Sequence, residues 1–270
     1  MRFASLGSGS KGNGTLVYAG STCLLVDCGF GRREAERRLA ERGISPEDLD
    51  AILVTHEHGD HSGGVAALSK RYALPVFTSH GTLASNRLTG SAQTVAFNAG
   101  DAFTVGDIDV QSVAVPHDAR EPVQFCFHWN SLKLGVLTDL GSLTPHVVEA
   151  FTGCTALLLE SNHDLELLTR GPYPPSLKRR VGGDYGHLNN TQTRELLLAL
   201  PGSPPTALVL AHLSEQNNTP EHVYAAIDGA YDPQLTSLTI AEQAQGFDWI
   251  DVSLESHSVH VETLRPGLAS

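Results

Sequence analysis

The chain has 270 residues, 41% hydrophobic and 18% charged, with 18 Lys and Arg against 30 Asp and Glu; this composition excludes a disordered chain. No apolar stretch approaches the roughly 20 residues needed to cross a bilayer, and the first residues do not resemble a signal peptide. The four cysteines lack Cys-x-x-Cys spacing, so we expect a reduced, cytoplasmic protein with no membrane partner.

Short apolar runs separated by glycine predict strands, the first of them joined in hairpins. These strands are expected at 2–6, 15–19, 22–27, 51–55, 76–79, 107–115, 123–129, 132–138 and 156–160. Charged stretches with apolar residues at helical spacing predict helices at 32–42, which Gly43 ends, and at 64–72, before Pro75.

The second half of the chain is predicted to mix helices with strands. Helices are expected near 191–200 and 220–230, and strands at 206–211, 235–241 and 259–264, the last two closing an edge. The loops 171–175 and 201–205 are rich in Pro and Gly but too short to link domains. The pattern therefore favours one domain over 1–270, with α and β elements around mixed sheets.

Histidine is the residue type that stands out, with 13 copies against one Met. Directly after strand 51–55, four residues form the pattern His-x-His-x-Asp-His: His56, His58, Asp60 and His61. Imidazole and carboxylate are the usual ligands of Zn²⁺ and related ions. In an extended turn His56 and His58 point the same way while Asp60 and His61 face a second position, so two adjacent ions are indicated. The alternative is a solvent-exposed polar turn.

This pattern after a buried strand resembles the signature of the metallo-β-lactamase superfamily. The resemblance implies a four-layer αββα sandwich, two mixed sheets flanked by helices. It also implies three further ligands, His117, the bridging Asp139 and His212, each near the end of an apolar strand, and Asp27 as the residue that orients the metal loop. Members with a redox di-iron centre usually carry Glu where this chain has His58, which favours hydrolysis.

The resemblance assigns the ligands to two ions. One ion would be held by His56, His58, His117 and Asp139, and the other by Asp60, His61, His212 and Asp139. Histidine-rich sites accept Zn²⁺ and Mn²⁺ alike, so two divalent ions, Zn or Mn, are the expected cofactors.

Within the superfamily the chain is similar to the YycJ (WalJ) group. The segments that carry this resemblance are 7–13, 159–164, 171–174, 177–180 and 186–190, with Asn189 where the group more often has Ser. The resemblance implies a 5′-to-3′ DNA exonuclease with a metal-bound hydroxide as nucleophile, DNA as substrate, and a role in mismatch repair beside repair-protein partners.

Four residues are candidates for proton transfer or for supporting the metal ligands. His187 is expected to be the general acid that protonates the leaving oxygen, the alternative being a surface or core histidine. Asp60 is expected to accept the proton of the attacking water. His163 and Asp164 either support a metal-bound histidine or only begin a helix at 165–168, with Asp164 as its N-cap.

Two segments are candidates for phosphate contact, although the net charge of −12 is expected to repel nucleic acid at long range. The glycine-rich segment 7–12 fits the fingerprint of a dinucleotide-binding loop, but it leads into a strand rather than a helix. We therefore interpret it as a turn near the metals. Its backbone N–H groups, with Ser8, Ser10 and Asn13, are expected to contact phosphate. The second segment is Lys178, Arg179 and Arg180, while the arginines of 32–42 alternate with glutamates and indicate a solvated helix face.

Other functions remain open from the sequence. The same fold hydrolyses thioesters, lactams or small cyclic phosphodiesters, and a metal-binding scaffold without catalysis is a third class. Intact ligands at every position argue against the scaffold. The sequence indicates neither the oligomeric state nor which of the two metals is used.

Overall fold

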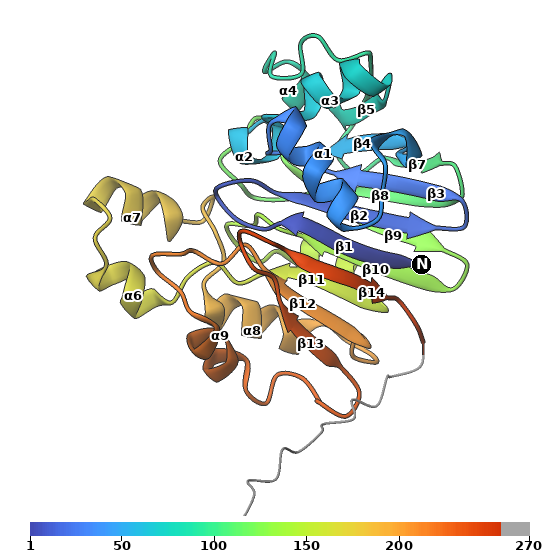
Figure 1. Cartoon of the computed structure of the whole chain (residues 1–270). Coiled ribbons are helices and arrows are strands. Elements are labelled where there is room, and N and C mark those ends of the chain that lie inside the picture. The colour runs from blue at the N-terminus through green and yellow to red at the C-terminus, as the bar shows by residue number, and fades with distance from the viewer. Residues whose placement is uncertain (255–270) are drawn as a thin grey trace, which may run out of the picture.

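Two seven-stranded sheets lie face to face in the computed structural model, which describes residues 1–254 (Figure 1). The first sheet has the order β14-β1-β2-β3-β4-β5-β6. Its strands are β1 (Arg2–Gly7), β2 (Gly14–Ala19), β3 (Thr22–Val26), β4 (Ala51–Val54), β5 (Pro75–Ser79), β6 (Gln93–Phe97) and β14 (Phe247–Asp251). Strands β14, β1, β2 and β3 pair antiparallel, and β3 to β6 pair parallel, so the sheet is mixed.

The second sheet has the order β13-β12-β11-β10-β9-β8-β7. Its strands are β7 (Ala102–Val105), β8 (Ile108–Ala114), β9 (Val123–Trp129), β10 (Leu132–Leu137), β11 (Ala156–Glu160), β12 (Ala207–Ala211) and β13 (Ser237–Ile240). Strands β10 to β13 pair parallel and β7 to β10 antiparallel. Its strands β11 and β12 are buried on both faces and are apolar except for Glu160 at the end of β11.

Three hydrophobic clusters define four layers. The cluster between the sheets includes Phe3, Leu24, Leu53, Phe125 and Leu158. A second cluster packs α1 (Arg32–Glu41) and α3 (Val65–Tyr72) on the outer face of the first sheet. A third packs α5 (Pro145–Phe151), α8 (Asn190–Ala199) and α9 (Pro220–Ile227) on the outer face of the second sheet. The expected αββα sandwich is therefore confirmed.

Several short elements complete the described fold. These are η1 (Pro46–Asp48, a 3₁₀ helix), α2 (Gly59–Ser62), α4 (His80–Leu83), α6 (Leu165–Arg170) and α7 (Pro175–Val181). Helices α6 and α7 project from one end of the sandwich, at the left of Figure 1. None of the helices among residues 1–254 combines the length and apolar character that a membrane crossing requires.

The structure differs from the sequence-based prediction mainly in short elements. The predicted strand 259–264 lies outside the described residues, and β14 is the strand that pairs with β1 at an edge. Helices α4, α5 and α7 and strands β6, β7 and β14 were not predicted, because four to seven residues give too little periodicity. The metal motif is not wholly an extended turn, since it becomes helix α2 at Gly59; the Ser62 hydroxyl donates to the carbonyls of Glu57 and His58 and closes this turn.

The strand ends bring the candidate ligands together. Asp27 and His56 follow β3 and β4 of the first sheet, whereas His117, Asp139 and His212 follow β8, β10 and β12 of the second. The order of the elements thus places residues far apart in the chain at one end of the sandwich.

Candidate metal centre and active site

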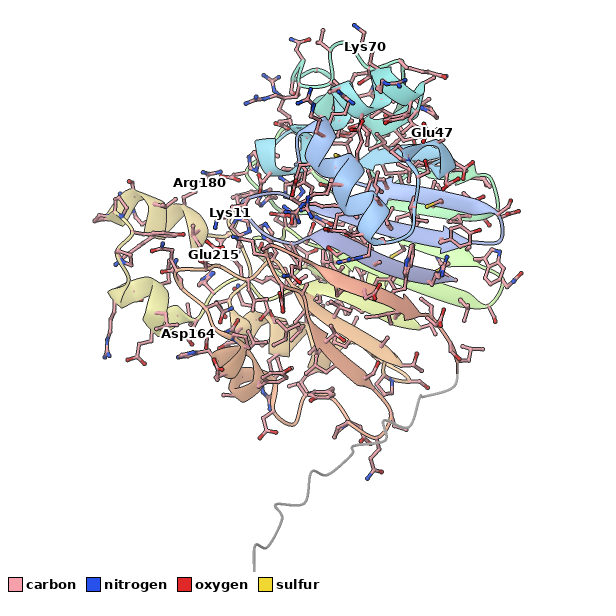
Figure 2. All side chains as sticks on the ribbon, viewed as in Figure 1. Lys11, Glu47, Lys70, Asp164, Arg180 and Glu215 are labelled. Atoms are coloured by element: carbon pink, nitrogen blue, oxygen red, sulfur yellow. The ribbon has the colours of Figure 1, made fainter. Side chains whose placement is uncertain are left out.

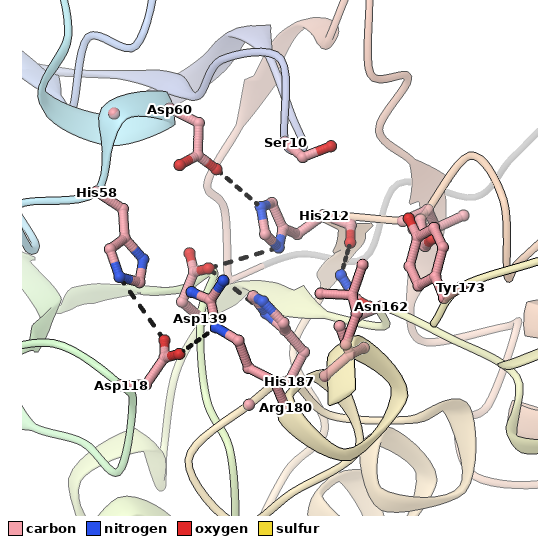
Figure 3. A pocket seen from close by; sticks show the side chains of 16 residues that line it. Ser10, His58, Asp60, Asp118, Asp139, Asn162, Tyr173, Arg180, His187 and His212 are labelled. Atoms are coloured by element: carbon pink, nitrogen blue, oxygen red, sulfur yellow. Dashed lines mark hydrogen bonds and ion pairs between the residues drawn. The ribbon is translucent and has the colours of Figure 1, made fainter. Parts of the chain in front are cut away.

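An open cavity of about 390 Å³ lies at this end of the sandwich (Figure 3). Its lining combines candidate ligands with residues of α7 and of the preceding loop: Ser10, His58, Asp60, Asp118, Asp139, Asn162, Tyr173, Leu177, Arg180, Val181, His187 and His212. The floor carries the histidines and carboxylates, so the cavity has the composition of a metal site open to substrate.

The ligand atoms form two neighbouring groups. In the first, His56, His58 and His117 each offer one nitrogen, and these nitrogens lie within 4.8 Å of one another. In the second, Asp60, His61 and His212 meet the same limit. The sequence motif, although continuous along the chain, thus contributes residues to both groups.

Asp139 lies between the two groups. Its Oδ2 is 3.2 Å from His61 Nε2 and its Oδ1 is 3.9 Å from His117 Nε2, and it also forms a group with His56 and His61. A carboxylate between two groups of candidate ligand atoms has the position that a bridging ligand would need.

Four histidines make hydrogen bonds through Nδ1; this leaves Nε2 without a partner in His56, His117 and His212, whereas Nε2 of His61 lies 3.0 Å from Asn13 Nδ2. Their Nδ1 atoms have these partners: Thr55 Oγ1 for His56 at 3.0 Å, Asp27 Oδ2 for His61 at 2.8 Å, the Gly186 carbonyl for His117 at 2.9 Å, and Glu160 Oε1 for His212 at 3.2 Å. A ring that donates from Nδ1 carries its lone pair on Nε2, the arrangement in which histidine binds metals.

Four of the buried atoms that face this centre have no hydrogen-bond partner: Nε2 of His56, His117 and His212, and Oδ2 of Asp139. Buried polar atoms normally have partners because leaving one unpaired is costly. Three lone pairs and a carboxylate oxygen aimed at a shared space therefore fit divalent metal ions.

The electrostatics of the residues point to the same ligand chemistry. Burial lowers the pKa of His56 well below its ordinary value, which keeps this ring neutral. Burial alone would raise the pKa of Asp139, but His212 and His61 hold it well below its ordinary value, so it is ionised. Burial alone would lower the pKa of His61, but the charges of Asp139 and Asp27 outweigh this effect and raise the pKa to about 9. These acidic residues thus attract positive charge to the cluster.

Asp27 supports the metal motif from the neighbouring strand. It accepts hydrogen bonds from the Thr55 backbone N–H at 2.9 Å and from the Thr55 hydroxyl at 2.8 Å, besides its contact with His61. The side chain thereby ties the start of the motif to its last histidine. This placement agrees with the orienting role expected from the sequence.

Glu160 is a functional candidate that the sequence analysis missed. It ends β11, is fully buried, and its Oε1 contacts His187 Nδ1 at 2.7 Å and His212 Nδ1 at 3.2 Å. Its Oε2 accepts the backbone N–H groups of Leu140 and Leu188. The available signal was its position at the end of a buried strand, which it shares with other residues of the site.

His187 lies between this carboxylate and the cavity. Its side chain is 19% exposed, and its Nδ1 is 3.5 Å from Asp139 Oδ1. With Asp139, Glu160 and His212 it also forms a fourth group of ligand atoms within 4.8 Å. Because Glu160 binds Nδ1, the ring keeps an orientation in which Nε2 is available to a substrate.

The comparisons with known proteins decide the family. The sequence model of the β-lactamase superfamily domain matches residues 22–213. The chain is 38% identical to exodeoxyribonuclease YycJ of Bacillus anthracis, over 82% of this chain and 85% of the relative. It is 35% identical to exodeoxyribonuclease WalJ of Streptococcus pneumoniae, over 82% and 84%. The chain belongs to the YycJ/WalJ group of the β-lactamase superfamily.

A solved structure supports the fold of this YycJ/WalJ-group protein. The metallo-β-lactamase fold protein YhfI from Bacillus subtilis matches it with a TM-score of 0.71 at 17% identity, over 93% of this chain and 99% of that one. Family membership and the buried ligand groups together make this chain a metal-dependent hydrolase.

Asp118 is a second residue that the sequence analysis missed. Its Oδ1 is 3.5 Å from His117 Nε2 and 3.7 Å from His58 Nε2, while its Oδ2 accepts from Arg180 Nε at 2.5 Å (Figure 3). The signal was its position beside His117. Asp118 thus connects the first ligand group to Arg180, an arginine that lines the cavity.

The predicted basic cluster does not act as a unit. Arg180 lines the cavity, whereas Lys178 donates to the Thr169 carbonyl and Arg179 is exposed outside the lining. Of the three residues predicted to contact phosphate, only Arg180 therefore lines the cavity, because α7 directs its neighbouring side chains apart; contact of Lys178 and Arg179 with phosphate stays a prediction.

The glycine-rich loop also divides. Ser10 lines the cavity, but Ser8 is buried and its hydroxyl accepts the His212 backbone N–H at 2.9 Å. Asn13 is buried too, with its Nδ2 3.0 Å from His61 Nε2 and 3.4 Å from Asp60 Oδ2. Ser8 and Asn13 hold the loop against the ligands, so the structure leaves Ser10 as the predicted phosphate contact of this loop that faces the cavity.

An ion pair lies beside this loop. Lys11 Nζ lies 2.7 Å from Glu215 Oε1, and both residues appear in Figure 2 at the end of the molecule where Arg180 is found. The pair joins the loop after β1 to the segment after β12, the two segments that carry Ser10 and His212.

His163 and Asp164 have different roles in the structure. Asp164 caps α6, since its carboxylate accepts from the backbone N–H groups of Glu166 and Leu167. His163 is buried with Nδ1 3.3 Å from Asn162 Oδ1, and burial lowers its pKa to about 4. The N-cap alternative thus describes Asp164, and among the described contacts neither residue hydrogen-bonds to a candidate ligand.

Proposed function

We propose that this protein is an exodeoxyribonuclease that hydrolyses DNA phosphodiester bonds with two divalent metal ions, Zn²⁺ or Mn²⁺. The relatives named exodeoxyribonuclease align over 82% of the chain, which supports DNA as the substrate. The observation that carries the proposal is the pair of ligand groups around Asp139, on the floor of a cavity that also contains His187. The 5′-to-3′ polarity and the role in mismatch repair stay predictions from the family resemblance.

The ligand groups would hold the two ions as follows: His56, His58, His117 and Asp139 for one, and Asp60, His61, His212 and Asp139 for the other. Bound there, such ions supply an activated water and neutralise charge on the phosphate. The protein's own carboxylates would otherwise repel a phosphate, so the cavity is suited to DNA only together with its cations.

Three side chains complete the reaction in this proposal. Asp60 Oδ2 accepts the proton of the attacking water, and Arg180 binds a non-bridging phosphate oxygen. His187 donates the Nε2 proton to the departing sugar oxygen, while Glu160 holds the proton on Nδ1. A sugar alkoxide is a poor leaving group, so this proton transfer is expected to be important for DNA.

The experiment is digestion of single- and double-stranded DNA, labelled at either end, by protein loaded with Zn²⁺ or Mn²⁺. We expect mononucleotides released from one end, and no release by the Asp139→Ala variant. Parallel assays use bis(p-nitrophenyl) phosphate, a β-lactam and a thioester. Turnover of the lactam or thioester with intact DNA would favour the other hydrolases, and loss of all turnover in the metal-loaded protein would favour a scaffold.

A further inference from the structure

The cavity has an apolar side that metal binding and phosphate contact leave unexplained. Tyr173, Leu177 and Val181 line it, and all three are partly exposed. Leu177 and Val181 are four residues apart on α7 and so share one face of the helix. None of the side chains of α7 is fully buried, which means that this helix presents apolar groups to the cavity rather than to a core.

The apolar side lies next to the reacting centre. In Figure 3, Tyr173 stands across the cavity from His58 and Asp118, on the side of His212 and Asn162. Arg180, on the same helix as Leu177, reaches instead to Asp118 beside the first ligand group. One short segment therefore offers a cation to the floor of the cavity and apolar surface to its wall.

We propose that Tyr173, Leu177 and Val181 form a subsite for the base of the nucleotide next to the cleaved phosphate. The inference rests on the proposed function and names the part of DNA that this wall receives. A nucleobase is flat and apolar on its faces, and aromatic side chains stack on any of the four bases. With the phosphate at the ligand groups, the base attached to it is the part of the substrate that meets Tyr173.

The size of the cavity agrees with a single nucleotide. Its volume of about 390 Å³ is near the lower end of the roughly 300–1,000 Å³ usual for small-molecule sites. A cavity that holds one base beside the metals suits an enzyme that removes nucleotides one at a time. Stacking also predicts little preference among the bases, because it reads no hydrogen-bonding edge.

The test compares the metal-loaded Tyr173→Ala and Tyr173→Phe variants on two substrates, an ordinary single-stranded oligonucleotide and one with base-free tetrahydrofuran residues at both ends. The control is Tyr224→Ala, which removes a tyrosine that is 49% exposed on α9 and does not line the cavity. On ordinary DNA, Tyr173→Ala should raise KM about 5- to 150-fold, and Tyr173→Phe, which keeps the stacking ring, should restore most of this loss. Tyr224→Ala should stay near the wild type.

On base-free ends, the wild type should itself lose affinity, and Tyr173→Ala should cause little further loss. In addition, the fluorescence of a terminal 2-aminopurine should be quenched by the wild type and by Tyr173→Phe but not by Tyr173→Ala. An equal rise of KM on both substrates, or no rise on ordinary DNA, would overturn the subsite while leaving the exonuclease intact. A wild type that cleaves no DNA would overturn both proposals.

Discussion

Replacing Glu160 by Gln changes one charge in a fully buried position and tests how the site is held together. Burial alone would raise the pKa of Glu160, but His187 and His212 bring it below its ordinary value, so the residue is a carboxylate near neutral pH. Its Oε2 already accepts the backbone N–H groups of Leu140 and Leu188. A glutamine must therefore keep its oxygen there and turn its NH₂ group toward the two histidines.

The hydrogen-bond donors of the glutamine and of the two histidines would then face one another. The NH₂ group would face Nδ1 of His187 and His212, where Oε1 now lies at 2.7 Å and 3.2 Å. Each ring would have to move its proton to Nε2, which removes the lone pair that His212 offers to a metal. Two charge-assisted hydrogen bonds, each worth about 1.5–3 kcal/mol, are lost. At about 1.4 kcal/mol per factor of ten, kcat/KM on DNA should fall about 10²–10⁴-fold.

The assay measures DNA cleavage, metal content and the thermal unfolding midpoint on the same preparation. Glu149→Gln, the same change at an exposed position of α5, is the control and should behave as the wild type. Combining Glu160→Gln with His187→Ala should add to the His187→Ala loss only the part that acts through His212, and this part should be accompanied by a lower metal content. A folded Glu160→Gln variant that cleaves DNA within a few-fold of the wild type would refute the reasoning.

Four further changes test separate parts of the site. Asp139→Ala should lose both metal ions, as measured by metal analysis, and two ions per chain in the purified variant would contradict the bridging role. His187→Ala should keep its metals and much of its activity on bis(p-nitrophenyl) phosphate while DNA cleavage falls at least about a hundredfold; equal losses on both substrates would end the general-acid proposal. Arg180→Ala should reduce the slope of the logarithm of DNA affinity against the logarithm of salt concentration by roughly one unit. Lys178→Ala should leave this slope unchanged, because Lys178 does not line the cavity. Asp164→Ala should cost about 1 kcal/mol of unfolding free energy in urea without changing metal content, and a loss of metal would show that it supports the ligands after all.

The metal motif was predictable from the sequence because its information is local. His56, His58, Asp60 and His61 lie within six residues behind a buried strand, and chain geometry alone keeps them close. His117, Asp139 and His212 were predictable for a related reason, since each follows an apolar run and the superfamily resemblance orders them. The alternation of apolar strands and amphipathic helices indicated mixed sheets with helices, and the superfamily resemblance implied the four layers.

Glu160 and Asp118 show what local information leaves out. Glu160 lies within the segment 159–164 that the sequence analysis had already marked, and Asp118 follows His117 directly, yet their importance comes from partners many residues away. Glu160 is 27 residues from His187 and 52 from His212 along the chain, and only the packing of β11, β12 and the loop before α8 brings these groups to hydrogen-bonding distance.

The basic cluster shows most clearly that the sequence alone does not determine where a side chain points. As a sequence, Lys178 and Arg180 are equivalent cations two positions apart, and nothing local separates them. The structure places both on α7, where side chains two positions apart point roughly 200° from each other, because each residue turns the helix by about 100°. Residue type and spacing thus indicated by themselves the metal motif at 56–61 and a fold of α and β elements around mixed sheets, and the superfamily resemblance added the other candidate ligands. Tertiary structure alone decided which cation, which serine and which carboxylate face the cavity, because orientation depends on the elements that carry the side chains and on what packs against them.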